Sequence, residues 1–132
     1  MNNPNNPCIF CTIRKNELIF ENNFAYASSD SYPVSKFHSL VVPKRCIKNY
    51  FELNDEEVLA CNDLIKKLKQ KIISEDDTVK GFNIGTNAGT AAGQSVFHCH
   101  IHVIPRREGD VKNPQGGVRS VIPSKQHYIR KK

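Results

Sequence analysis

The sequence predicts an α+β domain, in which an antiparallel sheet of about five strands packs against one long helix. Several short segments alternate apolar with polar residues, as strands with one buried face do. A single longer stretch, residues 54–74, instead repeats apolar residues every three or four positions, as an amphipathic helix does. A chain of 132 residues fits one domain, and we expect residues 1–132 to form it.

Five segments are expected to be strands. Residues 17–22 and 24–29 alternate in polarity about an Asn-rich turn, which predicts a β-hairpin. Residues 38–43 predict a third strand closed by a proline, residues 80–87 a fourth and residues 96–105 a fifth.

The long helix carries its own start signal. Asn54 is a suitable N-cap, and Glu57 follows three residues later, which together form a capping-box pattern. The apolar stripe expected to face the sheet consists of Val58, Cys61, Ile65, Leu68 and Ile72.

The two ends of the chain differ from the middle. Residues 1–7 are rich in Asn and Pro and are expected to be a flexible tail, and about 107–132 are expected to be irregular. No apolar run is long enough to cross a bilayer and no signal-peptide pattern opens the chain, so we expect a cytoplasmic protein with no membrane partner. The net charge is +6, but basic residues are not interleaved with aromatic ones, so nucleic acid is not the expected partner.

The stretch FHCHIHVIPR places His98, His100 and His102 at alternate positions. On a strand these three side chains project from one face, and the apolar residues between them from the other. The outer two Cα atoms would lie roughly 13 Å apart, which suits three ligands of one metal poorly. Different roles are favoured, with one imidazole acting as a nucleophile and the others orienting it or its leaving group.

An imidazole nucleophile needs its second nitrogen to donate a proton to a fixed acceptor. A phosphorus centre is a suitable target, and the preceding segment NAGTAAGQS offers backbone amides together with Gln94 and Ser95 as donors to phosphate oxygens. Glycine-rich segments also form plain turns, but the position of this one directly before the histidines favours a phosphate site.

These residues resemble the histidine-triad (HIT) superfamily, whose H-x-H-x-H pattern fits residues 98–102. The resemblance extends over most of the chain, through PCIFCTIRKNELIFENNFAYA, FHSLVVPKR, FELNDEEV and AGQSVFHCHIHVIPRREGD. It implies a HIT-like α+β fold, usually a homodimer. It also implies hydrolysis or transfer of a nucleoside monophosphate group, with attack at the α-phosphorus of an AMP-containing nucleotide.

The resemblance also assigns roles to individual residues. It implies that His100 forms a covalent nucleotidyl intermediate, that His102 positions the phosphate or the leaving group, and that His38 supports the site from a neighbouring strand. Asp30 falls where the family binds the ribose hydroxyls. The positions expected to contact the α-phosphate and leaving group are Asn87, Gln94 and Ser95, and those expected to line an apolar slot for the base are Ile9, Phe10 and Phe20.

Cys8 and Cys11 form a C-x-x-C pair, which is one of the two ligand pairs that a structural zinc site needs. In zinc-containing relatives the remaining ligands are the first triad histidine and a histidine just after the PK motif; this sequence has Cys46 at the latter place, a departure from the family's usual residue, but a thiolate also binds zinc. These correspond to His98 and Cys46, a Cys₃His set that would also fix His98 so that His100 is aimed. Free thiols, or a disulfide between Cys8 and Cys11, are the alternatives.

The tail of the chain resembles that of diadenosine-polyphosphate hydrolases. Its basic residues would either hold a polyphosphate chain or simply keep the surface soluble; they are Arg106, Arg107, Lys112 and Arg119. A nucleoside phosphoramidase, a regulatory nucleotide-binding protein with slow turnover and, less favoured, a zinc-dependent nucleic-acid binder are the competing hypotheses. The residues leave open whether a divalent cation such as magnesium takes part in turnover.

Overall fold

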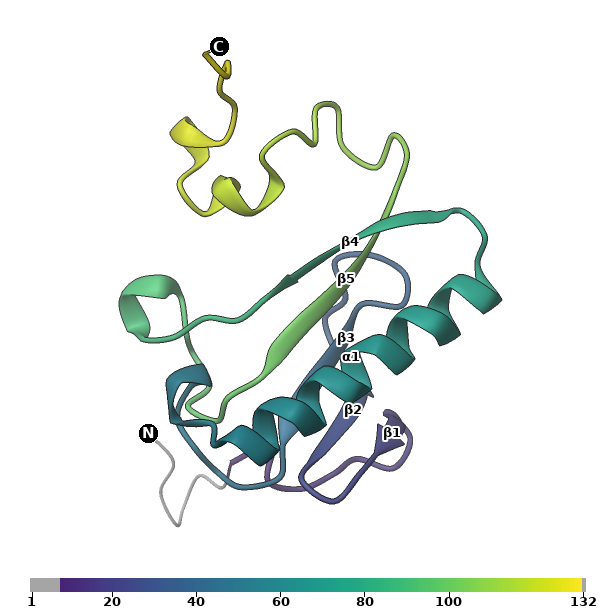
Figure 1. Ribbon diagram of the computed structural model, residues 1–132, viewed down its shortest axis with the longest axis vertical. Helices are drawn as coiled ribbons and strands as arrows, with labels where there is room; N and C mark the ends of the chain where they lie inside the picture. Colours follow the sequence, from purple (N-terminus) through teal and green to yellow (C-terminus); the bar gives the residue numbers. More distant parts are fainter. Residues whose placement is uncertain (1–7, 132) are drawn as a thin grey trace.

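The computed structural model describes residues 8–131, so the expected tail at residues 1–7 lies outside the described part. Five strands form one antiparallel sheet in the order β1-β2-β3-β5-β4, and one long helix crosses one face of it (Figure 1). The elements are β1 (Leu18–Glu21), β2 (Ala25–Ser29), β3 (Ser39–Pro43), α1 (Asp55–Glu75), β4 (Val79–Gly85) and β5 (Ile101–Arg107). The predicted α+β class and strand number are confirmed.

The start of α1 follows the capping-box prediction. The Asn54 side chain accepts a hydrogen bond from the Glu57 amide at 2.9 Å, and the Glu57 carboxylate accepts one from the Asn54 amide at 3.0 Å. Glu57 is buried because Arg45 also binds its two carboxylate oxygens at 2.8 and 3.0 Å. This ion pair ties the loop after β3 to the first turn of the helix.

The buried stripe of α1 differs from the predicted one at Val58, which is 37% exposed, and at Leu64, which is fully buried but was not among the predicted residues. The buried residues are Glu57, Ala60, Cys61, Leu64, Leu68 and Ile72. The capping box places Glu57 toward the sheet, and the helical repeat of 3.6 residues then directs Val58 outward. Ile65 packs at the edge of the core and is only partly buried.

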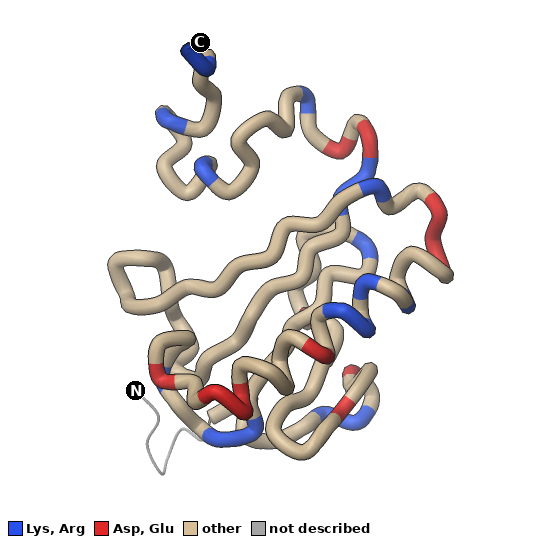
Figure 2. The backbone as a smooth tube through the Cα atoms, in the orientation of Figure 1, with Lys and Arg blue, Asp and Glu red and all other residues tan. Residues whose placement is uncertain are grey.

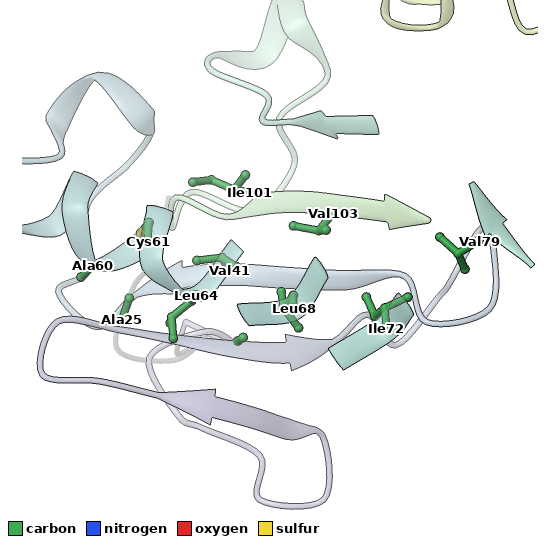
Figure 3. Close-up of a cluster of buried hydrophobic side chains, with 11 residues drawn as sticks. Ala25, Val41, Ala60, Cys61, Leu64, Leu68, Ile72, Val79, Ile101 and Val103 are labelled. Atoms are coloured by element: carbon green, nitrogen blue, oxygen red, sulfur yellow. The ribbon is translucent and has the colours of Figure 1, made fainter. Parts of the chain in front are cut away.

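The main core lies between α1 and the inner face of the sheet (Figure 3). Leu64 and Leu68 of the helix are fully buried, and Ile101 and Val103 reach the same cluster from β5. Because Ile101 and Val103 face the helix, the alternating His102 is left on the opposite, open face of the sheet.

The fifth strand begins at Ile101, five residues later than predicted, and residues 96–100 are not part of it. The Cys99 amide donates instead to the Ile47 carbonyl at 2.8 Å, which ties this segment to the loop after β3. The strand continues to Arg107 despite Pro105, because pairing with β3 stops at Val103 and the proline therefore removes no hydrogen bond on that side.

The segment after β5 was expected to be irregular, and it contains two short 3₁₀ helices, η3 (Gly117–Val121) and η4 (Pro123–Lys125). The helix η3 packs against β4. Lys and Arg residues lie at several separate places along the tail, along α1 and near the β1–β2 hairpin (Figure 2). Within residues 8–131 no helix is both long and apolar enough to cross a membrane.

Candidate active site

The three triad histidines occupy three different environments. His98 is completely buried, whereas His100 and His102 are partly exposed and line a cavity of about 500 Å³ on the open face of the sheet. The expectation that all three project from one strand is wrong, because only His102 lies within β5. The hydrogen bonds of each ring decide what its nitrogens can do.

His98 is held between the end of β3 and the N-terminal loop. Its Nε2 lies 2.7 Å from the Pro43 carbonyl oxygen, which can only accept, so Nε2 carries the proton of the neutral ring. Its Nδ1 lone pair therefore faces Cys8 Sγ at 3.1 Å and Cys11 Sγ at 3.5 Å. Burial lowers the pKa of His98, while the Pro43 hydrogen bond opposes that shift.

The ligand atoms of Cys8, Cys11, Cys46 and His98 all lie within 4.8 Å of one another. That is about twice a Zn–S bond of roughly 2.3 Å, so a single ion between them would reach all four with small side-chain adjustments. None of these cysteines is in a disulfide. An unprotonated Nδ1 aimed at two sulfurs is the donor arrangement that a Cys₃His zinc site requires, so the residues fit the metal.

His100 is fixed in the opposite tautomer. Its Nδ1 lies 2.8 Å from the His98 carbonyl oxygen, and this acceptor requires the proton on Nδ1. The Nε2 of His100 therefore carries the lone pair. Thr86 holds the backbone in place, since its hydroxyl donates to the His100 carbonyl at 2.7 Å, and the Phe10 ring contacts the imidazole with centroids 4.8 Å apart.

His38, Asp30 and His102 form a second connected group. The Val34 amide donates to His38 Nδ1 at 3.1 Å, so the proton of neutral His38 is on Nε2. That Nε2 lies 2.9 Å from His102 Nδ1 and 3.3 Å from Asp30 Oδ2. The shorter contact makes His102 Nδ1 an acceptor, which places the proton of neutral His102 on Nε2.

Both histidines of this group are neutral near pH 7. Burial lowers the pKa of His38, and the Asp30 carboxylate only partly opposes it. Burial also lowers the pKa of His102, with smaller contributions in the same direction from His100 and His38. His102 therefore offers one N–H donor beside His100, which offers a lone pair.

The cavity contains most of the other predicted site residues. Asp30, Asn87 and Ser95 line it together with the two histidines, and so do Ile9 and Phe10. Phe20 does not, because it packs instead against the core under α1, so its predicted place in a base slot is wrong.

Gln94 has a different position from that of Ser95. Its Oε1 accepts from the Gly89 amide at 2.8 Å, and its Nε2 donates to the Lys48 and Val96 carbonyls at 2.5 and 3.0 Å. The side chain is buried and holds the glycine-rich segment in shape, and both amide hydrogens are already used. Gly89 and Gly93 have φ of 96°, which favours glycine at both positions.

Three basic residues expected to hold polyphosphate already have partners. Arg106 pairs with Asp110 through two contacts of 2.8 Å, and Arg107 pairs with Asp76 at 2.9 Å. Arg119 donates to main-chain carbonyls of the tail and its guanidinium lies 4.6 Å from the Tyr128 ring centroid. Arg106 and Arg107 are thus neutralised by carboxylates, and none of the three arginines lines the cavity.

Sequence reasoning missed several residues that shape the cavity. Leu40 is the cross-strand partner of His102 and shares its face, so the β3 pattern could have identified it. Tyr26 donates its hydroxyl to the Phe10 carbonyl at 2.6 Å and so anchors the N-terminal loop as a wall of the cavity. That contact has no signal in the sequence.

Residues 12–109 match the HIT domain family, and the chain belongs to that family. Adenosine 5′-monophosphoramidase hnt1 of Schizosaccharomyces pombe is 36% identical over 103 residues, which are 75% of this chain and 74% of that protein. Adenylylsulfatase HINT3 of Arabidopsis thaliana is 34% identical over 109 residues, 80% of this chain and 55% of that protein.

A crystal structure of a Zn-bound histidine triad family protein from Mycobacterium smegmatis superposes on this chain with a TM-score of 0.70. It is 32% identical and covers 78% of this chain, which in turn covers 77% of it. The HIT membership inferred from the triad is thereby confirmed. Neither this structure nor the two relatives identifies a diadenosine-polyphosphate branch for this chain.

Proposed function

We propose that this protein hydrolyses AMP-linked substrates through a covalent adenylyl intermediate on His100. The observation that carries the proposal is the pair of opposed tautomers: a lone pair on His100 Nε2 and an N–H on His102 Nε2 at the same cavity. A nucleophile and a proton donor on adjacent rings are the two groups that displacement at phosphorus requires.

In the first half-reaction the His100 Nε2 lone pair forms a bond to the α-phosphorus. For this step His102 takes up a second proton from solvent, beside the Asp30 carboxylate 3.7 Å from its Nδ1. As the bond from phosphorus to the leaving group breaks, His102 Nε2 gives its proton to that group, and the ring is left neutral with a lone pair on Nε2. The adenylylated His100 ring then carries a positive charge, and its Nδ1–H remains bonded to the His98 carbonyl oxygen. Asp30 and Ser95 line the same cavity. We propose that Asp30 holds the ribose hydroxyls and Ser95 a phosphate oxygen.

In the second half-reaction water attacks the same phosphorus. His102 Nε2, now without its proton, takes one from the water, and the phosphorus–nitrogen bond to His100 breaks. AMP leaves, His100 returns to its starting tautomer, and His102 is again protonated for the next turnover. His38 is expected to act through His102, since its Nε2 lies 2.9 Å from His102 Nδ1 and fixes the orientation of that ring.

The leaving group is proposed to be an amine or another small group, with a polyphosphate as the second candidate. The polyphosphate hypothesis depended on basic residues that are paired within the chain, Arg106 and Arg107 above all. Similarity to a monophosphoramidase and an adenylylsulfatase supports a substrate in which AMP is the shared part and the leaving group differs.

A single-turnover assay tests this proposal. Wild type, His100→Ala and the control His127→Ala receive an adenosine 5′-phosphoramidate and, separately, diadenosine tetraphosphate. His127 is an exposed histidine in the tail, bonded to the Asn113 carbonyl, and its replacement should leave AMP release unchanged. AMP release by wild type that persists in His100→Ala would refute the nucleophile. Nucleotide binding without any turnover would favour the regulatory alternative.

We also propose that Cys8, Cys11, Cys46 and His98 hold a structural zinc ion. Such an ion would supply no chemistry to the reaction. It would hold the N-terminal loop and the His98 side chain in place, and the main-chain carbonyl of His98 in turn orients the His100 ring.

The remaining proposals are that residues 1–132 form one cytoplasmic domain and that the protein is a homodimer. The edge position of β4, with Ile84 49% exposed, is consistent with a second chain pairing there, and light scattering after gel filtration would test it.

A further inference from the structure

The loop between β2 and β3, residues 30–38, carries both Asp30 and His38. The Asp30 amide donates to the His38 carbonyl at 3.0 Å, so the two ends of the loop lie together. Inside the loop, the Val34 amide donates to His38 Nδ1, and this contact leaves the proton of His38 on Nε2, toward His102. The shape of the loop therefore decides how the His38 ring meets the His102 ring.

A β-turn over residues 35–38 ends the loop. The His38 amide donates to the Ser35 carbonyl at 3.1 Å, and the third residue of the turn, Phe37, has φ of 73°. Phe37 alone has a positive φ among the described non-glycine residues, so Lys36 before it has a negative one and the turn has the type II pattern. That pattern favours glycine at the third position, whereas phenylalanine favours a type I turn. The two types differ by rotation of the peptide unit between Lys36 and Phe37.

Side chains hold both peptide units that flank Phe37. The Lys36 carbonyl accepts a hydrogen bond from the Arg107 guanidinium at 3.1 Å, and the Phe37 carbonyl accepts one from the Ser39 hydroxyl at 2.8 Å. The Phe37 ring is partly buried against the main core. Rotation into a type I turn would direct the Lys36 carbonyl away from Arg107, so the arginine opposes that rotation.

Arg107 is itself anchored at the end of the long helix. Its Nη2 lies 2.9 Å from Asp76 Oδ2, and its Nε donates to the Thr78 hydroxyl oxygen at 3.2 Å. Asp76 is the C-cap of α1, and its pKa is about 2 because the Thr78 hydroxyl and Arg107 bind its carboxylate. The ion pair is therefore complete at neutral pH, and Arg107 joins the end of α1 to the loop.

We propose that Arg107 is a positioning residue of the active site, which acts by holding the Lys36 carbonyl and so keeping the turn in its type II form. In that form the Val34 amide stays on His38 Nδ1, and His38 Nε2 stays against His102. Without the guanidinium the turn relaxes, and the His38 ring no longer orients the His102 ring. The expected effect on rate rests on the proposed function, whereas the state of the His38 ring can be observed without turnover.

The test replaces Arg107 with methionine, which keeps most of the side-chain length and removes the guanidinium. Arg107→Met should lower kcat for an adenosine 5′-phosphoramidate about tenfold and leave KM near its wild-type value, since part of the contribution of a positioned general acid is lost. Arg106→Met is the matched control and should keep the wild-type kcat. Arg106 precedes Arg107 in β5 and is also ion-paired, but it bonds to Asp110 and Asn83 rather than to the loop.

A rescue variant separates positioning from stability. Phe37→Gly removes the reason for the turn to change, because glycine adopts a positive φ without strain. Added to Arg107→Met, it should recover most of the lost kcat, although it also removes a ring from the edge of the core. Phe37→Asn is the second rescue variant, since asparagine also tolerates this φ. A purely stabilising role of Arg107 predicts the opposite, a further loss when the ring is removed.

Nitrogen–proton correlation spectra of the imidazole rings, recorded at mildly basic pH, show which nitrogen carries the proton. Wild type and Arg106→Met should show His38 with its proton fixed on Nε2. Arg107→Met should show both tautomers of His38, and the rescue variant should restore the single form. These spectra need no substrate and are insensitive to a change in stability of the folded protein.

A single Nε2-protonated His38 in Arg107→Met, whatever its rate, would overturn the inference. A kcat within about twofold of wild type in that variant would overturn it as well, and so would a loss that neither Phe37 variant recovers. Failure of wild type to release AMP would instead refute the hydrolase proposal, and the spectra would still decide whether Arg107 holds the His38 ring.

Discussion

Replacing His38 with phenylalanine removes both ring nitrogens and keeps a ring of similar size. His38 is 4% exposed and joins the Val34 amide on one side to His102 Nδ1 on the other. The variant leaves the Val34 donor without its partner, which should cost about 1–3 kcal/mol of unfolding free energy. It also frees His102 to take either tautomer.

The effect on catalysis should be larger than the effect on stability. A positioned general acid contributes about 10²–10⁴-fold, and His38→Phe disorders that acid without removing it. We therefore expect kcat to fall about 100-fold, close to 2.7 kcal/mol of activation free energy, at about 1.36 kcal/mol per factor of ten. His38→Gln keeps an N–H donor and an acceptor and should recover part of the loss.

Rapid-quench measurement of AMP release under saturating substrate gives the chemical step, and denaturant unfolding gives the stability. His127→Phe serves as the control for loss of a histidine outside the cavity. A His38→Phe rate within about threefold of wild type, below about 0.7 kcal/mol, would refute the role assigned to the His38–His102 hydrogen bond. Equal rates for the Phe and Gln variants would refute it as well.

Three further predictions concern the metal site, the helix start and the core. Cys46→Ser should lower zinc content measured by atomic emission and lower the Tm, and a zinc stoichiometry equal to wild type would exclude Cys46 as a ligand. Arg45 holds the pKa of Glu57 below its ordinary value, so the Glu57–Arg45 ion pair stabilises the fold above pH 4.5, and this stabilisation is lost as pH falls through the lowered pKa. Glu57→Gln should therefore make the unfolding free energy depend less on pH below 4.5. The same pH dependence in wild type and variant would contradict this. Leu68→Ala should lower the unfolding free energy by about 2–5 kcal/mol in urea melts, because Leu68 is completely buried, and a loss under about 1 kcal/mol would not fit the core described.

Local sequence signals predicted the helix well, because its determinants are local. Asn54 and Glu57 bond to each other across three residues, so the pattern alone specifies the cap. Val58 lies outside the buried stripe because the capping box directs Glu57 toward the sheet, where Arg45, twelve residues earlier in the chain, binds its carboxylate. An interaction between side chains on different elements has no periodic signature.

Sequence reasoning identified most residues of the site but not how they are arranged. Alternation suggested one strand from residue 96, but the Cys99 amide bonds to the Ile47 carbonyl and His98 turns into the protein toward Pro43. The residue before His38 is Phe37, whose φ of 73° is rare for a bulky side chain and has no counterpart in local propensity. The helix η3 lies against β4, and no motif in the tail indicates this contact.

The central claim is a covalent adenylyl group on His100 Nε2, and its most direct test is to capture that adduct. A slowly cleaved adenosine phosphoramidate is mixed with excess enzyme, quenched at increasing times, and the protein digested for peptide mass spectrometry at neutral to mildly basic pH. The account predicts one AMP adduct that appears before free AMP, maps to His100, and is absent from His100→Ala. AMP release at the wild-type rate with no adduct at any time, or an adduct on His102, would contradict it.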